Sequence, residues 1–213
     1  MNQIYSTLIQ VSNSSDYERK NAVEDWHAIH ETIVLDIFEQ LYRGDISFWD
    51  DDQGRAKFSA FIAFQYGRTP KMRISSMYAV KKIENLKNID IVNNYNQKKI
   101  AKYFDVLLPE LIGNYLYSRS KLILLVNNTG FDFITCDQPV YNIKANLESI
   151  EMPKEFELYY PISPQRALIF TENEDFDAKL TIEKVDNFNK FMCAVSEEQI
   201  YSNSSVLLEK YEI

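Results

Sequence analysis

Cysteine is scarce in this sequence. Among 213 residues there are two, Cys136 and Cys193, which are too few for the disulfide framework of a small secreted domain. Disulfides are rare in the cytosol, where thiols are kept reduced. We therefore expect both thiols to be reduced and the protein to be cytoplasmic.

Glycine and histidine are scarce as well, with five and two residues respectively. A loop that cradles phosphate through its backbone N–H groups needs several closely spaced glycines, so this class of nucleotide site is excluded. The chain has six prolines and contains no internal repeat or low-complexity segment. It offers little material for flexible linkers.

Long apolar runs and an excess of positive charge are also missing. The longest apolar runs, such as Leu122–Val126, fall far short of the ~20 residues of a membrane helix, and the start of the chain lacks a signal-peptide pattern. The formal charge is −8, from 23 Lys and Arg against 31 Asp and Glu. Because nonspecific nucleic-acid binding depends on clustered basic side chains, we expect neither a membrane nor a nucleic-acid partner.

The chain does contain enough apolar material for a sizeable core. Hydrophobic residues make up 46% of it and aromatic residues 14%, at a length near the upper end for one domain. We expect a single domain, residues 1–213, with a helical part, 1–118, followed by a sheet part, 119–213.

Apolar residues recur at intervals of three and four along most of the first half, which is the repeat of amphipathic helices. Gly44 follows the last periodic residue of the first helix and is placed to end it. Pro70 disfavours helical geometry at Thr69 and should interrupt the second. The predicted helices cover about residues 16–42, 53–69, 71–86 and 94–117, with Pro109 bending the last.

After Ser118 the period changes to two, which is typical of strands. Leu122–Val126 and Phe131–Thr135 flank a segment rich in Asn and Gly, which predicts a β-hairpin. Further strands are predicted at 157–161, 166–171, 178–181 and 206–208, with one late helix at about 184–199. Helices first and strands afterwards predict an α+β fold, in which the helical half packs on a mainly antiparallel sheet.

The sharpest chemical signature lies in the stretch Phe131–Val140. A strand rich in aromatic and β-branched residues runs there into the turn Thr135-Cys136-Asp137-Gln138-Pro139, which would aim a polar group at the strand's end. The Asp137 carboxylate is a candidate general base, metal ligand or partner of a basic group. Local chemistry alone favours the alternative, a turn in which it accepts local backbone N–H bonds, because turn-forming Asp is common.

A second polar cluster follows the apolar run Phe61–Phe64. Gln65 and Arg68 are one helical turn apart, just before the expected break, and Arg73 follows. Arginine in such a place can hold a carboxylate or phosphate through two parallel hydrogen bonds. The alternative is an arginine that ties a helix end to a neighbouring carboxylate.

The first predicted helix carries His27, His30 and Glu31. Their spacing gives only weak support for a metal site. Helical zinc sites use two His at i and i+4 with a third ligand elsewhere, and the chain has no third His. We assign no metal ligand and no cofactor, and leave a requirement for a divalent metal open. Cys136 has no histidine near it in sequence, so a Cys–His nucleophile is not indicated either.

Three different motifs follow one another along the chain: Phe61-Ile62-Ala63-Phe64-Gln65-x-x-Arg68-Thr69-Pro70-x-x-Arg73, Phe133-Ile134-Thr135-Cys136-Asp137-Gln138-Pro139-Val140 and Tyr160-Pro161-Ile162-Ser163-Pro164. With the region around His30 and with Asn189, they resemble a bacterial family known only as a domain of unknown function, number four-two-three-eight. The resemblance covers most of the length. It implies little about activity, although such families accompany mobile elements or phage-defence loci, which suggests an effector or toxin role.

The chain also departs from that family. Members usually open with a His-x-x-Pro-x-x-Tyr-Leu type segment, and nothing like it lies between Met1 and Asp16. If that His belongs to an active site, a protein partner is expected to supply the missing N-terminal segment, or the chain keeps the scaffold without the chemistry. Cys136 stands where the family has Ser, and a family acidic position falls at His30 or Glu31.

The functional hypothesis places these side chains in one polar pocket between helices and sheet. Arginine would hold a small anionic or phosphate-bearing substrate while a carboxylate activates water, as in a hydrolase. The expected ligand-binding residues are Gln65, Arg68, Arg73 and Thr135, and the expected catalytic residues are Asp137, Glu31 and Arg68. The alternative is a non-catalytic binding or interaction protein, part of a defence or toxin-type complex, in which the same residues form a buried salt-bridge network.

Overall fold

The computed structural model describes residue 28 and residues 31–69, 71, 72, 74, 78, 97–146 and 155–211, with side chains in the stretch 97–107 excepted. Most of the first predicted helix and most of the segment 71–86 lie outside these ranges. Within them, no helix is both long and apolar enough to cross a membrane.

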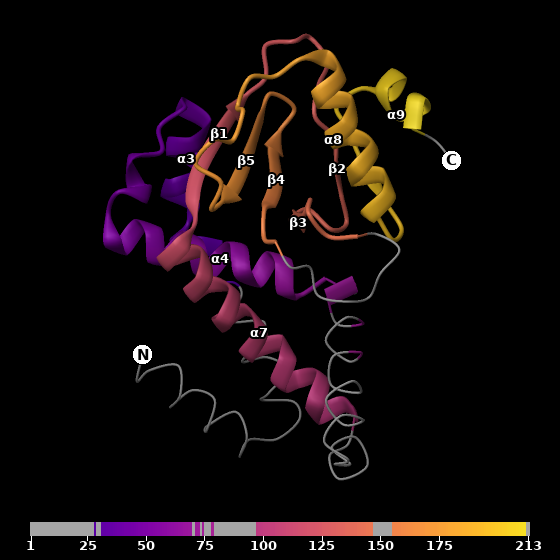
Figure 1. Cartoon of the computed structure of the whole chain (residues 1–213). Helices are drawn as coiled ribbons and strands as arrows, with labels where there is room; N and C mark the ends of the chain where they lie inside the picture. Colours follow the sequence, from indigo (N-terminus) through magenta and orange to yellow (C-terminus); the bar gives the residue numbers. More distant parts are fainter. Residues whose placement is uncertain are drawn as a thin grey trace.

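The helices and strands follow the predicted α+β order (Figure 1). The helices are α3 (Leu35–Arg43), the short 3₁₀ helix η1 (Ser47–Trp49), α4 (Asp52–Gly67), α7 (Gln97–Arg119), α8 (Ile182–Val195) and α9 (Ser205–Tyr211). The strands are β1 (Lys121–Val126), β2 (Thr135–Cys136), β3 (Tyr141–Asn142), β4 (Leu158–Ser163), β5 (Arg166–Thr171) and β6 (Ile200–Tyr201).

Local sequence signals set two helix ends, and Gly44 acts as predicted. Gly44 adopts a left-handed conformation with φ of 85°, and it ends α3, because only a residue without Cβ takes this geometry freely. Asp50, Asp51 and Asp52 lead into α4, and Asp51 caps the helix by accepting the Gly54 N–H at 2.7 Å. A carboxylate at this position also meets the positive end of the helix dipole.

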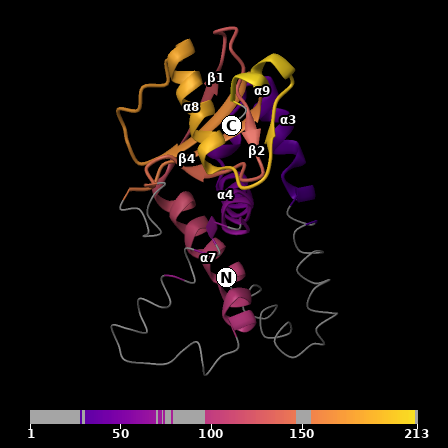
Figure 2. The ribbon, with the colours of Figure 1, turned by 90° about the vertical axis from the view of Figure 1, so that its right-hand side faces the viewer.

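A four-stranded antiparallel sheet, ordered β1-β5-β4-β3, lies between helices on its two faces (Figures 1 and 2). Successive residues of a strand point to opposite faces, and Tyr159 and Tyr160 of β4 show which helices cover each. Tyr160 meets Phe38 of α3 edge-on with ring centroids 6.4 Å apart, whereas Tyr159 stacks on Phe188 of α8 at 4.4 Å. The sheet is therefore the middle layer of the fold.

Helix α4 is apolar on more than one side and is buried between the sheet and α7. Phe58 faces the sheet, with its ring 6.1 Å from that of Phe170 on β5. On the side of α7, Gly67 faces Pro109, and Ala63 faces Gly113. Small residues at these two contacts let the helix backbones approach closely. Helix α7 continues through Pro109.

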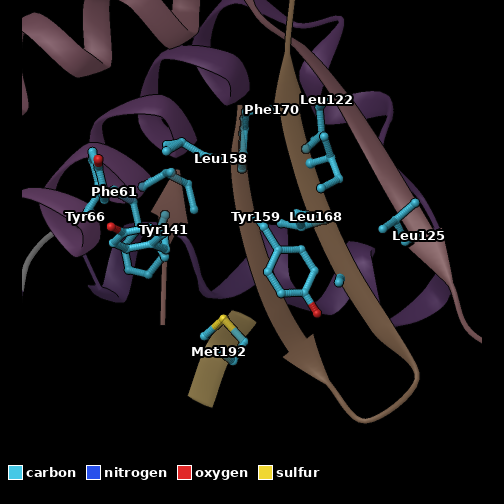
Figure 3. Packing of buried hydrophobic residues seen from close by; sticks show 14 of the residues in the cluster. Phe61, Tyr66, Leu122, Leu125, Tyr141, Leu158, Tyr159, Leu168, Phe170 and Met192 are labelled. Carbon is cyan, nitrogen blue, oxygen red and sulfur yellow. The ribbon is translucent and has the colours of Figure 1, made fainter. Parts of the chain in front are cut away.

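The core joins all three layers (Figure 3). Its largest fully buried side chains include Tyr159, Phe58, Phe170, Leu41, Ile62, Leu116 and Met192. The ring of Tyr66 on α4 lies 6.5 Å from that of Tyr141 on β3, so that the end of α4 packs on the edge of the sheet.

The predicted hairpin between Leu122–Val126 and Phe131–Thr135 is wrong. Strand β1 pairs instead with β5, so that Leu124 lies opposite Leu168. Asn127 closes a local turn by donating to Phe131 O at 2.7 Å, and Asn189 of α8 binds the following segment through Ile134 N–H and Asp132 O. These bonds replace the strand pairing that the hairpin would have supplied.

Two other strand predictions are also wrong, while the strands predicted at 157–161 and 166–171 are confirmed as β4 and β5, which pair with each other. Residues 178–181 form no strand, and Thr181 instead caps α8 by accepting the Lys184 N–H at 3.2 Å. Residues 206–208 belong to helix α9. The late part of the chain therefore holds two helices, and the strand β6 between them pairs with β2 in a second small sheet.

Candidate functional site

Arg68 lies at the C-terminal end of α4, where it is the capping residue. Its Nη2 donates to Gln65 Oε1 at 2.6 Å, and its Nη1 donates to Glu31 Oε1 at 3.4 Å. The side chains of Arg68 and Glu31 are 44% and 53% exposed, whereas Gln65 is buried. A buried amide thus orients a guanidinium that solvent can reach.

Local helix geometry explains this arrangement. Residues three apart lie on the same face of a helix, so Gln65 and Arg68 meet within one turn. The C-terminal end of a helix carries partial negative charge, which favours a cation there. Glu31 lies just before α3, 37 residues earlier in the chain.

Tyr160 lies close to this group and was missed as a site residue. Burial raises the pKa of Tyr160 to about 12, the nearby Tyr42 adds to the rise, Arg68 opposes it and Glu31 adds to it. The Tyr160 hydroxyl therefore keeps its proton at neutral pH and is available as a donor. Its place in the third sequence motif was the signal that could have identified it. We refer to Glu31, Gln65, Arg68 and Tyr160 as the Arg68 cluster.

Asp137 makes a different set of contacts. Its Oδ1 accepts the backbone N–H of Glu197 at 3.0 Å, and its Oδ2 accepts that of Glu198 at 2.7 Å. The backbone N–H of Asp137 donates to Gln199 O at 3.1 Å. The carboxylate accepts backbone N–H bonds, as in the turn alternative, but from a segment distant in sequence.

The structure brings together only some of the predicted site residues. Among the residues that it describes, no ion pair or hydrogen bond joins Arg68 to Asp137. Thr135 pairs with Tyr201 in the small sheet, and its buried Oγ1 has no hydrogen-bond partner there. Arg73, His27 and His30 lie outside the described ranges.

Neither cysteine has the environment of a nucleophile. Burial raises the pKa of Cys136 to about 12 and also raises that of Cys193, and a reactive thiol needs the opposite shift. Cys136 Sγ is held locally by the backbone of Gln138 at 3.3 Å. Within the described part of the chain, no group of three or more His, Cys, Asp or Glu is placed to hold a metal ion.

Comparison with known sequences and structures identifies a family. No curated protein and no solved structure matches the chain significantly. The sequence model of a family described as "protein of unknown function (DUF4238)" matches residues 5–206. That range takes in Arg68, Asp137 and Tyr160, and it covers nearly the whole length. The chain therefore belongs to the DUF4238 family.

Proposed function

We propose that the chain binds a small anionic ligand, such as a phosphate-bearing compound, through Arg68. The observation that carries the proposal is a guanidinium that is nearly half exposed, yet fixed by Gln65 Oε1 at 2.6 Å. A planar guanidinium can offer paired N–H donors to phosphate or carboxylate oxygens. The Tyr160 hydroxyl supplies a further donor nearby.

The ligand would replace Glu31 as the partner of Arg68. An exposed ion pair of this kind contributes only about 0–1 kcal/mol, and the Arg68–Glu31 contact is long at 3.4 Å. A phosphate accepting two hydrogen bonds from one guanidinium is a stronger partner. Exchange of the two anions therefore needs little energy.

Hydrolysis of the bound ligand is a second candidate function, which the position of Glu31 favours. Once released from Arg68, its carboxylate would lie beside the bound anion, where it can accept a proton from water. Asp137 is less suited to this role, because both of its carboxylate oxygens accept backbone N–H bonds. In the non-catalytic form of the proposal, Glu31 only competes with the ligand.

Calorimetric titration with phosphate and pyrophosphate tests the binding proposal. We expect Arg68→Gln to weaken binding by about tenfold or more, as the loss of a charge-assisted pair worth ~1.5–3 kcal/mol implies. Arg43→Gln is the matched control, because Arg43 forms a comparable exposed pair with Glu39 at 3.4 Å on α3. Equal binding by wild type and Arg68→Gln would refute the proposal.

Glu31→Gln separates the two forms. In both forms it should tighten anion binding, since it removes the competing carboxylate. In the catalytic form it should also abolish release of phosphate from a phosphate monoester such as p-nitrophenyl phosphate. If the wild-type protein binds the anion but releases no phosphate from the monoester, the non-catalytic form of the proposal holds.

A further inference from the structure

A pocket of about 250 Å³ lies between α7 and the end of the sheet where β4 begins and β5 ends. Tyr115 of α7 forms one wall, and the residues around Phe156 and Glu172 form the others. The pocket contains no member of the Arg68 cluster. It is large enough for a ligand of a few heavy atoms, although it is smaller than typical drug sites of ~300–1,000 Å³.

A buried carboxylate lines this pocket. The side chain of Glu157 is only 6% exposed. Its Oε2 accepts a hydrogen bond from Thr171 Oγ1 at 2.7 Å, and its Oε1 lies 3.6 Å from Lys144 Nζ. That separation is longer than a hydrogen bond, and within the described ranges no other donor reaches Oε1. A buried carboxylate normally needs fuller compensation.

The charges around the pocket are mainly negative. Among the described residues, Glu155, Glu157 and Glu172 line it together with Lys144. Arg119 approaches Glu172 only to 3.9 Å, and the two side chains are 68% and 47% exposed. A cation with its own hydrogen-bond donors would therefore be favoured over an anion in this pocket.

Aromatic rings complete the lining. Tyr115 and Phe156 pack edge to face, with ring centroids 5.0 Å apart, and both contribute to the pocket wall. Organic cations are attracted to the faces of such rings within ~6 Å of the centroid. Carboxylates beside aromatic rings distinguish an organic ammonium or guanidinium from a bare metal ion, which rings do not ligate.

We propose that this pocket binds a small organic cation, an aliphatic amine or guanidine compound, with its charged group on Glu157 and its apolar stem against Tyr115 and Phe156. Lys144 occupies part of the site in the free protein. Because the Lys144 side chain is 44% exposed, it can move into water when the ligand arrives. The ligand then donates the hydrogen bond to Glu157 Oε1 that Lys144 is too distant to make.

The test is calorimetric titration of the full chain with putrescine and agmatine, with 1-butanol as the uncharged analogue. Binding of the cations but not of 1-butanol is expected. Glu157→Gln should weaken binding about tenfold, the factor that corresponds to loss of one charged hydrogen bond. Lys144→Gln should act in the opposite direction and tighten it, because it removes the resident cation. If Glu157 and Lys144 served only to stabilise the fold, their substitutions would not change amine binding in opposite directions.

Two further variants serve as controls for the effect of Glu157→Gln on amine binding. Glu39→Gln removes an exposed glutamate of α3 that is remote from the pocket lining, and it should leave amine binding unchanged. Tyr115→Leu removes a ring without touching the buried carboxylate, and it should weaken binding severalfold even if Glu157→Gln does not fold. Absence of amine binding to the wild-type chain, equal binding by Tyr115→Leu, or weaker binding by Lys144→Gln would each overturn the proposal.

Discussion

Asp137 and Glu198 are 61 residues apart in sequence, and the Asp137 Oδ2 accepts the backbone N–H of Glu198 at 2.7 Å. The neighbouring bonds to Glu197 and Gln199 make this a three-point attachment. It joins the end of β2 to the segment between α8 and β6, directly beside the pairing of Cys136 with Ile200. The carboxylate therefore holds the small sheet in place.

Asp137→Ala is expected to destabilise the fold by about 1–3 kcal/mol, since two backbone N–H donors lose a charged acceptor. Asp137→Asn keeps one acceptor oxygen, so its stability should lie between those of wild type and Asp137→Ala. Urea unfolding followed by circular dichroism measures both. Asp175→Asn is the control, because this exposed side chain accepts no hydrogen bond from the described residues. A fully stable Asp137→Ala that nevertheless loses ligand turnover would assign the residue to chemistry instead.

Asp186 of α8 anchors α9 in a similar way. Its carboxylate is 15% exposed and lies 2.7 Å from Lys190 Nζ and 2.6 Å from Lys210 Nζ, and it accepts the Tyr211 hydroxyl at 2.6 Å. These hydrogen bonds, led by that from Lys190, lower the pKa of Asp186. Since the folded pKa lies below the unfolded value of about 3.9, the stabilisation is present above that pH and is lost as the pH falls further.

Asp186→Asn should therefore lower the melting temperature most at pH 7, and its difference from wild type should shrink as the pH falls below about 3.9. Exposed pairs contribute ~0.2–1 kcal/mol each, and a charged hydrogen bond contributes ~1.5–3 kcal/mol. A loss of about 1–2 kcal/mol would lower the melting temperature by ~2–8 °C in a chain of this size. The difference between the variant and wild type is measured by thermal unfolding from pH 7 downwards, and a pH-independent difference would contradict the assignment.

Tyr159→Phe is expected to leave the protein as stable as wild type, or more stable by up to about 1 kcal/mol. The ring is fully buried and stacked on Phe188, and its hydroxyl has no hydrogen-bond partner among the described residues. An unsatisfied buried hydroxyl costs ~1–3 kcal/mol, while the methylene-sized void left behind offsets part of the gain. Tyr159→Leu, which removes the stacking, is the contrasting variant and should be clearly destabilising.

The same residue predicts how stability changes at high pH. Burial raises the pKa of Tyr159 well above 10, so its ionisation is resisted in the fold. The associated stabilisation is present below pH 10 and declines as the pH rises beyond it. Urea midpoints measured between pH 8 and pH 11 should fall less steeply for Tyr159→Phe than for wild type.

Short-range features could be predicted from the sequence because a few neighbouring residues determine them. Gly44 ends α3, and Ser163 and Pro164 lie at the turn that joins β4 to β5. The contact between Gln65 and Arg68 follows from their helical spacing. In each case the geometry is fixed within a few residues, and distant parts of the chain do not alter it.

Long-range partners could not be predicted in the same way. The sequence around β1 favours a hairpin with the residues that follow, yet β1 pairs with β5, because Asn189 on α8 binds the intervening backbone instead. The sequence identifies Asp137 as a strand-end group, but the backbone donors that its carboxylate accepts come from a loop 60 residues later. Tyr160 lies in the Arg68 cluster because of the register in which β4 pairs with β5. No local sequence pattern specifies that register.

Gly54 and Gly113 provide a matched pair of substitutions that tests the helical half. A Cβ at Gly54 would lie 2.4 Å from the backbone oxygen of Phe48, whereas a Cβ at Gly113 would meet its nearest neighbour, Ala63 Cβ, at 3.6 Å. Gly54→Ala should therefore force η1 away from α4 and cost about 1–3 kcal/mol. Gly113→Ala is in ordinary contact and should stabilise α7 by up to ~1 kcal/mol through helix propensity. Thermal unfolding should shift in opposite directions for the two variants, and a similar loss from both would mean that α7 packs on α4 more tightly than these distances indicate.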